Sequence, residues 1–175
     1  MSMFAYGKSH HSDLIIQLVK SINCQTYLEL GIYDGMTMAS VAQIVPRVIG
    51  VDIKDIRIHK NIGEFHQSTT QEFLNNFNEK VDVIFIDADH SFESVKKDFE
   101  LSLRLLNEFG MIILHDTDPI SEEYLSELRC GDSYKMIDWL KENYPDMDVL
   151  TLPVSEAGLT IIRRSNERRV NKFIK

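Results

Sequence analysis

The sequence has few cysteines, few basic residues and no long apolar run, and each shortage excludes a class of protein. Cys24 and Cys130 are its two cysteines, without metal-binding spacing, so they are expected to be reduced thiols of a cytoplasmic protein. The net charge of −8 argues against nucleic-acid or acidic-membrane partners, which would need a basic face. No apolar run approaches the roughly 20 residues of a membrane span, and no signal peptide is recognised.

The length and composition predict a single domain over residues 1–175. An apolar content of 43% is ordinary for a globular chain, and 175 residues can bury one good core. We expect residues 1–24 to form a lid and a helix, with Tyr6, His10 and His11 in the lid and Ser12 as the N-cap of the helix. Residues 165–175 are expected to be a solvated basic tail.

The chain is organised around the stretch Thr26–Thr37, TYLELGIYDGMT. Residues 27–30 are expected to form a buried strand, and residues 36–44 a helix. A strand, a glycine loop and a helix open a nucleotide-binding βαβ unit. The spacing here, however, is Glu29-x-Gly31-x-x-x-Gly35 and not G-x-G-x-x-G.

The acid in this motif favours a cationic ligand over a pyrophosphate. S-adenosylmethionine has no phosphate and carries an ammonium and a sulfonium, which suit the carboxylate of Glu29. Gly31 lets the backbone approach a ligand closely, and Gly35 keeps the helix start free of a Cβ. Thr37 can offer its hydroxyl or amide to the methionine carboxylate. On these residues the chain resembles the class I S-adenosylmethionine-dependent methyltransferases, whose first motif is acid-x-Gly-x-x-x-Gly.

Further residues fit the two ends of an adenosine group. The predicted strand 47–52 ends in Asp52, 21 residues after Gly31, where an acid can accept both ribose hydroxyls of NAD or of S-adenosylmethionine. A weak strand over residues 62–66 precedes Thr69-x-x-Glu72, a capping box for a short helix to residue 77. The resemblance implies that the loop after this strand contacts adenine, a role for Ser68 or Gln67.

The remaining pattern predicts a Rossmann-like, doubly wound α/β fold. Its sheet is expected to be mostly parallel and seven-stranded, with a C-terminal antiparallel hairpin and helices on both faces. A plain dinucleotide fold would continue with a crossover helix instead. The expected elements are a central strand 81–86, a helix begun by Ser91 and ended by Gly110, a strand 111–114, helices 121–128 and 133–144, and strands 147–152 and 159–163.

Polar residues follow two of these strands and should meet at one edge of the sheet. Asp87, His115 and Asp116 are a candidate divalent metal site, since carboxylates suit Mg²⁺ and a His ligand admits Mn²⁺, Fe²⁺ or Zn²⁺. Substrate contacts are the alternative explanation of this cluster. Asp89, His90 and His115 are the candidate acid–base residues. His115 could also serve only to bond Asp89 or the substrate.

The resemblance becomes more specific at these residues. The segments DADHSFESVKKD at 87–98 and LHDT at 114–117 resemble a small-molecule methyltransferase family that includes sugar and macrolide O-methyltransferases and cephalosporin-hydroxylase-like proteins. The similar strip covers residues 27–117. It implies a cofactor contact at Asp87 and Mg²⁺ or Mn²⁺ ligands at Asp87 and Asp116. His115 departs from the acidic residue of the family.

The leading expectation is therefore O-methylation of a small molecule, such as a sugar hydroxyl, with N-methylation as a close variant. A non-catalytic S-adenosylmethionine-binding module is one alternative. A nicotinamide-dependent oxidoreductase is another, which Asp52 permits and Glu29 disfavours. The acceptor cannot be read from the sequence, and a short chain could close its site against a second copy of itself.

Overall fold

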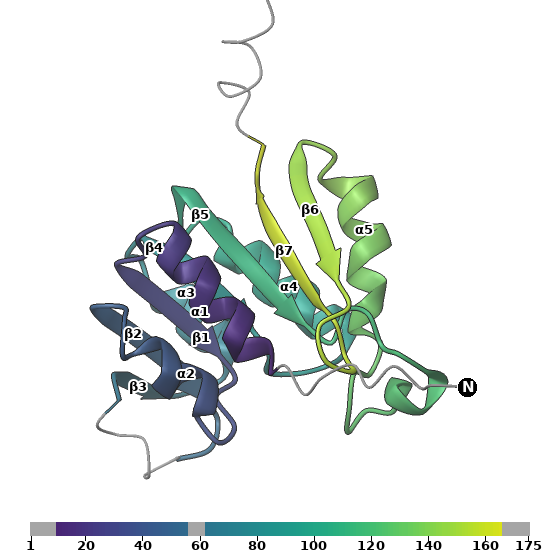
Figure 1. The fold of residues 1–175 in the computed structure, drawn as a ribbon, viewed down its shortest axis with the longest axis horizontal. Coiled ribbons are helices and arrows are strands. Elements are labelled where there is room, and N and C mark those ends of the chain that lie inside the picture. The colour runs from purple at the N-terminus through teal and green to yellow at the C-terminus, as the bar shows by residue number, and fades with distance from the viewer. Residues whose placement is uncertain (1–9, 56–61, 166–175) are drawn as a thin grey trace, which may run out of the picture.

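A computed structural model describes residues 10–55 and 62–165 of the chain. Within them, seven strands form one sheet in the order β3-β2-β1-β4-β5-β7-β6 (Figure 1). All neighbouring pairs are parallel except those that involve β7, which is antiparallel to both β5 and β6. The predicted Rossmann-like sheet with its C-terminal hairpin is confirmed. The strands are β1 (Thr26–Leu30), β2 (Arg47–Asp52), β3 (Glu64–Gln67), β4 (Val81–Ile86), β5 (Leu106–His115), β6 (Met147–Leu152) and β7 (Leu159–Arg164).

Helices cover both faces of the sheet, as Figure 1 shows. One face packs against α1 (His11–Ser21) and α2 (Met36–Val41), and the other against α3 (Thr70–Asn76), α4 (Phe92–Ser102) and α5 (Met136–Asn143). The core is accordingly divided into two apolar clusters, one in each layer. The expected lid residues 1–9, which include Tyr6, and the tail residues 166–175 lie outside the described residues.

Strand β4 illustrates how the sequence produces the two layers. Val83 and Phe85 belong to the cluster under α1 and α2, whereas Ile84 and Ile86 belong to the cluster under α3, α4 and α5. Because alternate side chains of a strand point to opposite faces, an uninterrupted apolar run fills both layers. Each such side chain, at most 2% exposed, stabilises the fold by about 1.5–3 kcal/mol.

Gly110 was expected to end a helix, and this prediction is wrong. Helix α4 ends at Ser102, and Gly110 lies inside β5, which begins at Leu106. A Cβ at Gly110 would lie 2.6 Å from the backbone oxygen of Asp82. The missing side chain therefore permits a close approach of β5 to β4, next to the irregular register between Val81 and Val83.

Two helix caps were predicted correctly and one was not. The hydroxyls of Thr69 and Ser91 accept the expected hydrogen bonds at the starts of α3 and α4. At α1, the cap is His10, whose Nδ1 accepts a hydrogen bond from the amide of Ser12 at 3.4 Å. Ser12 instead lies in the first turn of that helix.

Three predicted helices are shorter than expected. Helix α2 ends at Val41 and not at residue 44. The predicted helix 133–144 is a 3₁₀ turn over residues 133–135 followed by α5. Residues 121–128 contain only a 3₁₀ turn, Glu122–Leu125, because the amides of Cys130 and Gly131 bond back to this segment and fold it into a compact loop.

The two cysteines, Cys24 and Cys130, are separate buried thiols, in line with the expectation of unpaired residues. None of the helices in the described part of the chain has the length and apolarity needed to cross a bilayer.

Candidate active site

The loop after β1 is held tightly against the end of β4. Gly31 has φ +87°, and a Cβ there would lie 2.2 Å from the backbone oxygen of Asp87. The amide of Gly31 donates to the oxygen of Val51, and the amide of Asp87 donates to the oxygen of Leu30. Only glycine fits this position, because both its conformation and its surroundings exclude a side chain. Gly35, at φ +76°, is the N-cap of α2.

Glu29 is buried below this loop and not displayed at the edge of the sheet. Its side chain accepts a hydrogen bond of 2.7 Å from the hydroxyl of Tyr27 and another from the amide of Met38. The residue is 2% exposed. Burial raises the pKa of Glu29 to about 8, and the hydrogen bonds compensate only in part. The carboxyl is therefore mostly protonated at neutral pH.

Asp52, the predicted ribose residue, braces the glycine loop. Its Oδ2 accepts hydrogen bonds from the amides of Ile32 and Tyr33 at 2.9 and 3.1 Å, and its Oδ1 accepts one from the backbone amide of Lys54 at 2.8 Å. Two carboxylate oxygens offer about four acceptor positions, so one remains for a ligand.

A cavity of about 370 Å³ opens beside Asp52. Ser68 is not among the described residues that line it, and its hydroxyl has two alternative acceptors, the backbone oxygen of Thr69 at 3.1 Å and Oε2 of Glu72 at 3.3 Å. Thr69, Thr70 and Gln71 line this side of the cavity instead. The described lining is Gly31, Val51, Asp52, Ile53, Thr69, Thr70, Gln71, Ala88, Asp89 and Ser94.

Four charged or titratable side chains meet where β4 and β5 end. The parallel register places Ile86 beside Leu114, so the residues that follow come together at the same edge. Nδ1 of His115 lies 3.1 Å from Oδ1 of Asp87 and 3.4 Å from Oδ1 of Asp116. Nε2 of His90 lies 3.2 Å from Oδ2 of Asp116. This arrangement joins Asp87, His90, His115 and Asp116 into one cluster.

The cluster fixes the protonation of its central histidine. Burial alone would lower the pKa of His115, but Asp87 and Asp116 outweigh it and raise this pKa to about 10. Burial would likewise raise the pKa of Asp116, but its hydrogen bond and charge interaction with His115 hold the pKa below the usual range. His115 is therefore an imidazolium between two carboxylates at neutral pH.

Asp89 stands apart from this cluster and turns to the start of α4. Its Oδ1 accepts a hydrogen bond of 2.8 Å from the amide of Ser91. Burial would raise the pKa of Asp89, but hydrogen bonds from Ser91 and Ser94 lower it. The alternative bond between His115 and Asp89 is not formed, since Nδ1 of His115 faces Asp87 and Asp116.

The first turn of α1 brings His11 over the site. Nε2 of His11 lies 3.0 Å from the hydroxyl of Thr37, the residue predicted to bind the methionine carboxylate. The His11 ring also packs on that of His115, with centroids 4.3 Å apart. Burial, reinforced by the charge of His115, lowers the pKa of His11 to about 4 and keeps its ring neutral.

A second cavity, of about 440 Å³, lies on the other side of the cluster. The described residues that line it include Tyr124, Arg129 and Glu156, which were not among the predicted site residues. They come from two loops without a recognisable motif, so only their spatial neighbourhood reveals them. The full described lining is His10, His11, His115, Asp116, Tyr124, Arg129, Cys130, Ser155, Glu156 and Ala157.

Comparison with known proteins places the chain in a family. A family model described as a methyltransferase domain matches residues 28–117, just over half of the chain. The fold and the site define a protein of the class I methyltransferase type, and the chain belongs to this methyltransferase-domain family. It is also 27% identical over 112 residues to an uncharacterized protein of Acanthamoeba polyphaga mimivirus. That match covers 52% of this chain and 51% of the relative. The chain therefore spans about half the length of this curated relative.

Solved structures share the fold. A Staphylococcus aureus protein assigned as a caffeoyl-CoA O-methyltransferase has a TM-score of 0.72 at 23% identity, over 88% of this chain and 82% of that one. A Podospora anserina methyltransferase bound to S-adenosylhomocysteine gives 0.70 at 18% identity, over 89% and 78%. A Bacillus cereus O-methyltransferase in complex with S-adenosylhomocysteine gives 0.68 at 19% identity, over 91% and 83%.

Proposed function

We propose that the protein transfers the methyl group of S-adenosylmethionine to an oxygen atom of a small molecule. The observation that carries the proposal is that two cavities open at the carboxyl ends of the strands, one beside β1 and β2 and one beside β5, in a chain of a methyltransferase-domain family. Ligands of open α/β sheets bind at this edge. One cavity begins at Gly31 and Asp52, and the other at His115 and Asp116.

The first cavity fits S-adenosylmethionine better than a dinucleotide. Its described lining contains two acids, Asp52 and Asp89, and neither Lys nor Arg. Such a lining suits a ligand with an ammonium and a sulfonium and opposes a pyrophosphate. The cofactor, when bound, supplies an electrophilic methyl group to the acceptor. We assign its methionine end to the loop of Gly31 and Gly35 with Thr37 and Asp87, and its ribose to Asp52. Glu29, buried below this loop, supports the loop and does not contact the ligand. Residues 69–71 line the cavity in place of Ser68, the expected adenine contact.

Proton removal from the acceptor requires a base next to the second cavity. His115 is already protonated and held by two carboxylates, and Asp89 is used to begin α4. His90 remains. It lines a neighbouring cavity of about 830 Å³ and not the second cavity itself, and its Nε2 lies 3.2 Å from Asp116, which does line the second cavity. A neutral imidazole can take the acceptor proton, and the neighbouring carboxylate stabilises the imidazolium that results. We therefore assign the base to His90.

A divalent cation is a second way to use the same cluster. Ligand atoms of Asp87, His90 and Asp116 all lie within 4.8 Å of one another, a grouping in which His90 replaces the expected His115. Two carboxylates and an imidazole suit Mn²⁺ and also admit Mg²⁺. Such an ion would lower the pKa of a coordinated acceptor hydroxyl. In this arrangement, His90 would be a ligand and not the base.

Calorimetric titration with S-adenosylhomocysteine, with and without Mn²⁺, tests the proposal. We expect binding, and a metal-dependent heat that Asp87→Asn and Asp116→Asn abolish would assign the cation site. Glu64→Gln, which removes an exposed carboxylate on β3, is the matched control.

The alternatives give different results in the same experiments. Binding of NADH without S-adenosylhomocysteine would point to an oxidoreductase and overturn the proposal. Cofactor binding that is unchanged in Asp87→Ala and Asp116→Ala, without methylated product from any acceptor, would point to a binding module.

A further inference from the structure

The segment between β5 and α5 is fixed firmly against the candidate active site. The amide of Asp132 donates to the backbone oxygen of His90 at 3.1 Å, and its Oδ1 accepts from the amide of Phe92 at 2.6 Å. Gly131, at φ +53°, approaches the same His90 oxygen so closely that a Cβ would lie 2.4 Å away. The segment is thus anchored beside the proposed base.

The other end of this segment is joined to the loop between β6 and β7. The amides of Asp118 and Ile120 donate to the backbone oxygens of Ala157 and Glu156 at 2.8 and 3.0 Å. With both ends held, the segment forms a wall of the 440 Å³ cavity, to which it contributes Tyr124, Arg129 and Cys130.

On this wall, Arg129 is held by an aromatic ring. Its Cζ lies 4.3 Å from the centroid of the Tyr124 ring. Tyr124 is itself positioned by a hydrogen bond of 2.6 Å from its hydroxyl to Oε2 of Glu156. A guanidinium stacked on an aromatic ring keeps its N–H edge available, and that edge matches the two oxygens of a carboxylate or phosphate.

Arg129 differs in its charge environment from the cations that are ion-paired, and in its place on the cavity wall from Arg104 and Arg164, which bond to backbone oxygens. Arg47, Lys135 and Arg163 each form an ion pair with a carboxylate. No ion pair within 4.0 Å involves Arg129 in the part of the chain that the structure describes. It is also the only Lys or Arg among the described residues that line this cavity. Glu156 lines the same cavity but is bonded to the Tyr124 hydroxyl. A positive group that forms no ion pair among the described residues, in a chain with a net charge of −8, offers a specific place for an anion.

We propose that the methyl acceptor is a hydroxylated small molecule with an anionic group, a carboxylate or a phosphate, and that Arg129 binds this group. The inference rests on the proposed methyl transfer, because it assigns the acceptor side of the same site. The acceptor hydroxyl lies toward Asp116, which lines the cavity and lies 3.2 Å from His90, and its anionic group lies toward the stacked guanidinium. The cavity has the volume of a small-molecule site. Arg129 is thus a residue that determines specificity.

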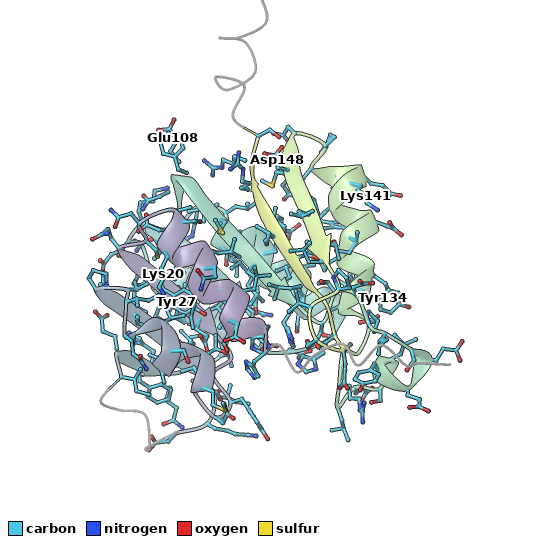
Figure 2. The ribbon with its side chains drawn as sticks, in the orientation of Figure 1. Lys20, Tyr27, Glu108, Tyr134, Lys141 and Asp148 are labelled. Atoms are coloured by element: carbon cyan, nitrogen blue, oxygen red, sulfur yellow. The ribbon has the colours of Figure 1, made fainter. Side chains whose placement is uncertain are left out.

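Matched acceptor pairs test the assignment. Each pair consists of an acid and a neutral analogue: 3,4-dihydroxybenzoate with 3,4-dihydroxybenzamide, glucuronate with glucose, and glucose 6-phosphate with glucose. The rate of methyl transfer is measured from the amount of S-adenosylhomocysteine that is formed. Binding of the same compounds to protein loaded with S-adenosylhomocysteine is measured by calorimetry. The variants are Arg129→Gln, Arg129→Lys and, as a control, Lys141→Gln, which removes the same charge from the outer surface of α5 (Figure 2).

We expect the unaltered protein to prefer the acid of at least one pair. Arg129→Gln should weaken kcat/KM or binding for that acid by about 10- to 100-fold, which is the value of a charge-assisted hydrogen bond. The loss should appear mainly in KM, and Arg129→Lys should recover part of it. The neutral analogue and the Lys141→Gln control should be unaffected. The carboxylate and phosphate pairs distinguish the two anionic groups.

Other outcomes overturn the assignment. The assignment is wrong if the unaltered protein has the same kcat/KM and affinity for the acid and its neutral analogue. It is also wrong if Arg129→Gln weakens both equally, or if none of the acids binds. A preference for acceptors with an amine over acceptors with an acid would indicate that Glu156 and Asp116, and not Arg129, bind the charged group of the acceptor. These failures differ from failure of the methyl-transfer proposal, in which S-adenosylhomocysteine itself would not bind.

Discussion

Glu29→Gln is predicted to remove a pH dependence from the stability of the fold. The carboxyl of Glu29 is 2% exposed, and its main partner is the hydroxyl of Tyr27 at 2.7 Å. Glutamine has nearly the same shape and can still accept this hydrogen bond through its amide oxygen. It cannot ionise, so a comparison of the two proteins isolates the protonation of residue 29.

The magnitude follows from the pKa of Glu29, which is raised from 4.5 to about 8 in the folded protein. Because the folded pKa is raised, the stabilising contribution is complete below pH 4.5 and is lost as the pH rises through about 8. Within this window, each pH unit lowers the free energy of unfolding by about 1.4 kcal/mol. From pH 5 to pH 7, the ionisation of Glu29 in the unfolded chain should therefore lower the free energy of unfolding by about 2–3 kcal/mol, a loss that Glu29→Gln avoids.

Urea unfolding at pH 5, 6, 7 and 8 measures this difference. The free-energy difference between the two proteins should change by about 2–3 kcal/mol from pH 5 to pH 7, in favour of the variant at the higher pH. In the control Glu64→Gln, the pKa of the removed carboxyl is lowered by Arg47, so its difference should stay flat over this range. A flat difference for Glu29→Gln as well would refute the reasoning and mean that Glu29 is ionised in the fold.

Three further changes follow from the site geometry. Gly31→Ala should destabilise the fold by about 2–4 kcal/mol in urea unfolding and weaken S-adenosylhomocysteine binding, because the residue needs φ +87° and its Cβ would clash with Asp87; unchanged stability would contradict this. Asp87→Asn should lower the pKa of His115 from about 10, as measured by NMR titration of the imidazole, because a carboxylate that raises it is lost; an unchanged value would leave Asp116 as the sole cause. Ser91→Ala should cost about 1 kcal/mol in urea unfolding, since its hydroxyl accepts the first-turn amide of Ser94; no change would show that this 3.4 Å contact contributes little.

The sequence predicted the central elements best because their signals are local. The bounds of β2 and β4 agree with the structure, since apolar runs that end in an acid define a buried parallel strand in both cases. Gly110 was misread because a glycine after a helical pattern is typical of a cap. Glycine is required at position 110 because a side chain there would clash with the backbone oxygen of Asp82 in the neighbouring strand β4. Such long-range contacts leave no local pattern in the sequence.

The candidate site was predictable only as far as topology determines it. Residues 87–90 and 115–116 were expected to lie side by side at the ends of two neighbouring strands. The structure brings Asp87, His90, His115 and Asp116 together but turns Asp89 away to the amide of Ser91. Their individual partners could not be read from the sequence, because side-chain directions after a strand depend on local backbone geometry. Asp116, for example, has φ +61°, which no pattern in the sequence indicates.

The bonds of Asp52 have a consequence for ligand energetics. This one carboxylate connects the tip of β2 to the loop after β1 through the amides of Ile32 and Tyr33. Asp52 is therefore part of both the predicted ribose site at the end of β2 and the predicted methionine site at the loop after β1. A ligand that orders one of these sites also orders the other. Adenosine and methionine, offered as separate molecules, should consequently bind with positive cooperativity, which Asp52→Asn should weaken.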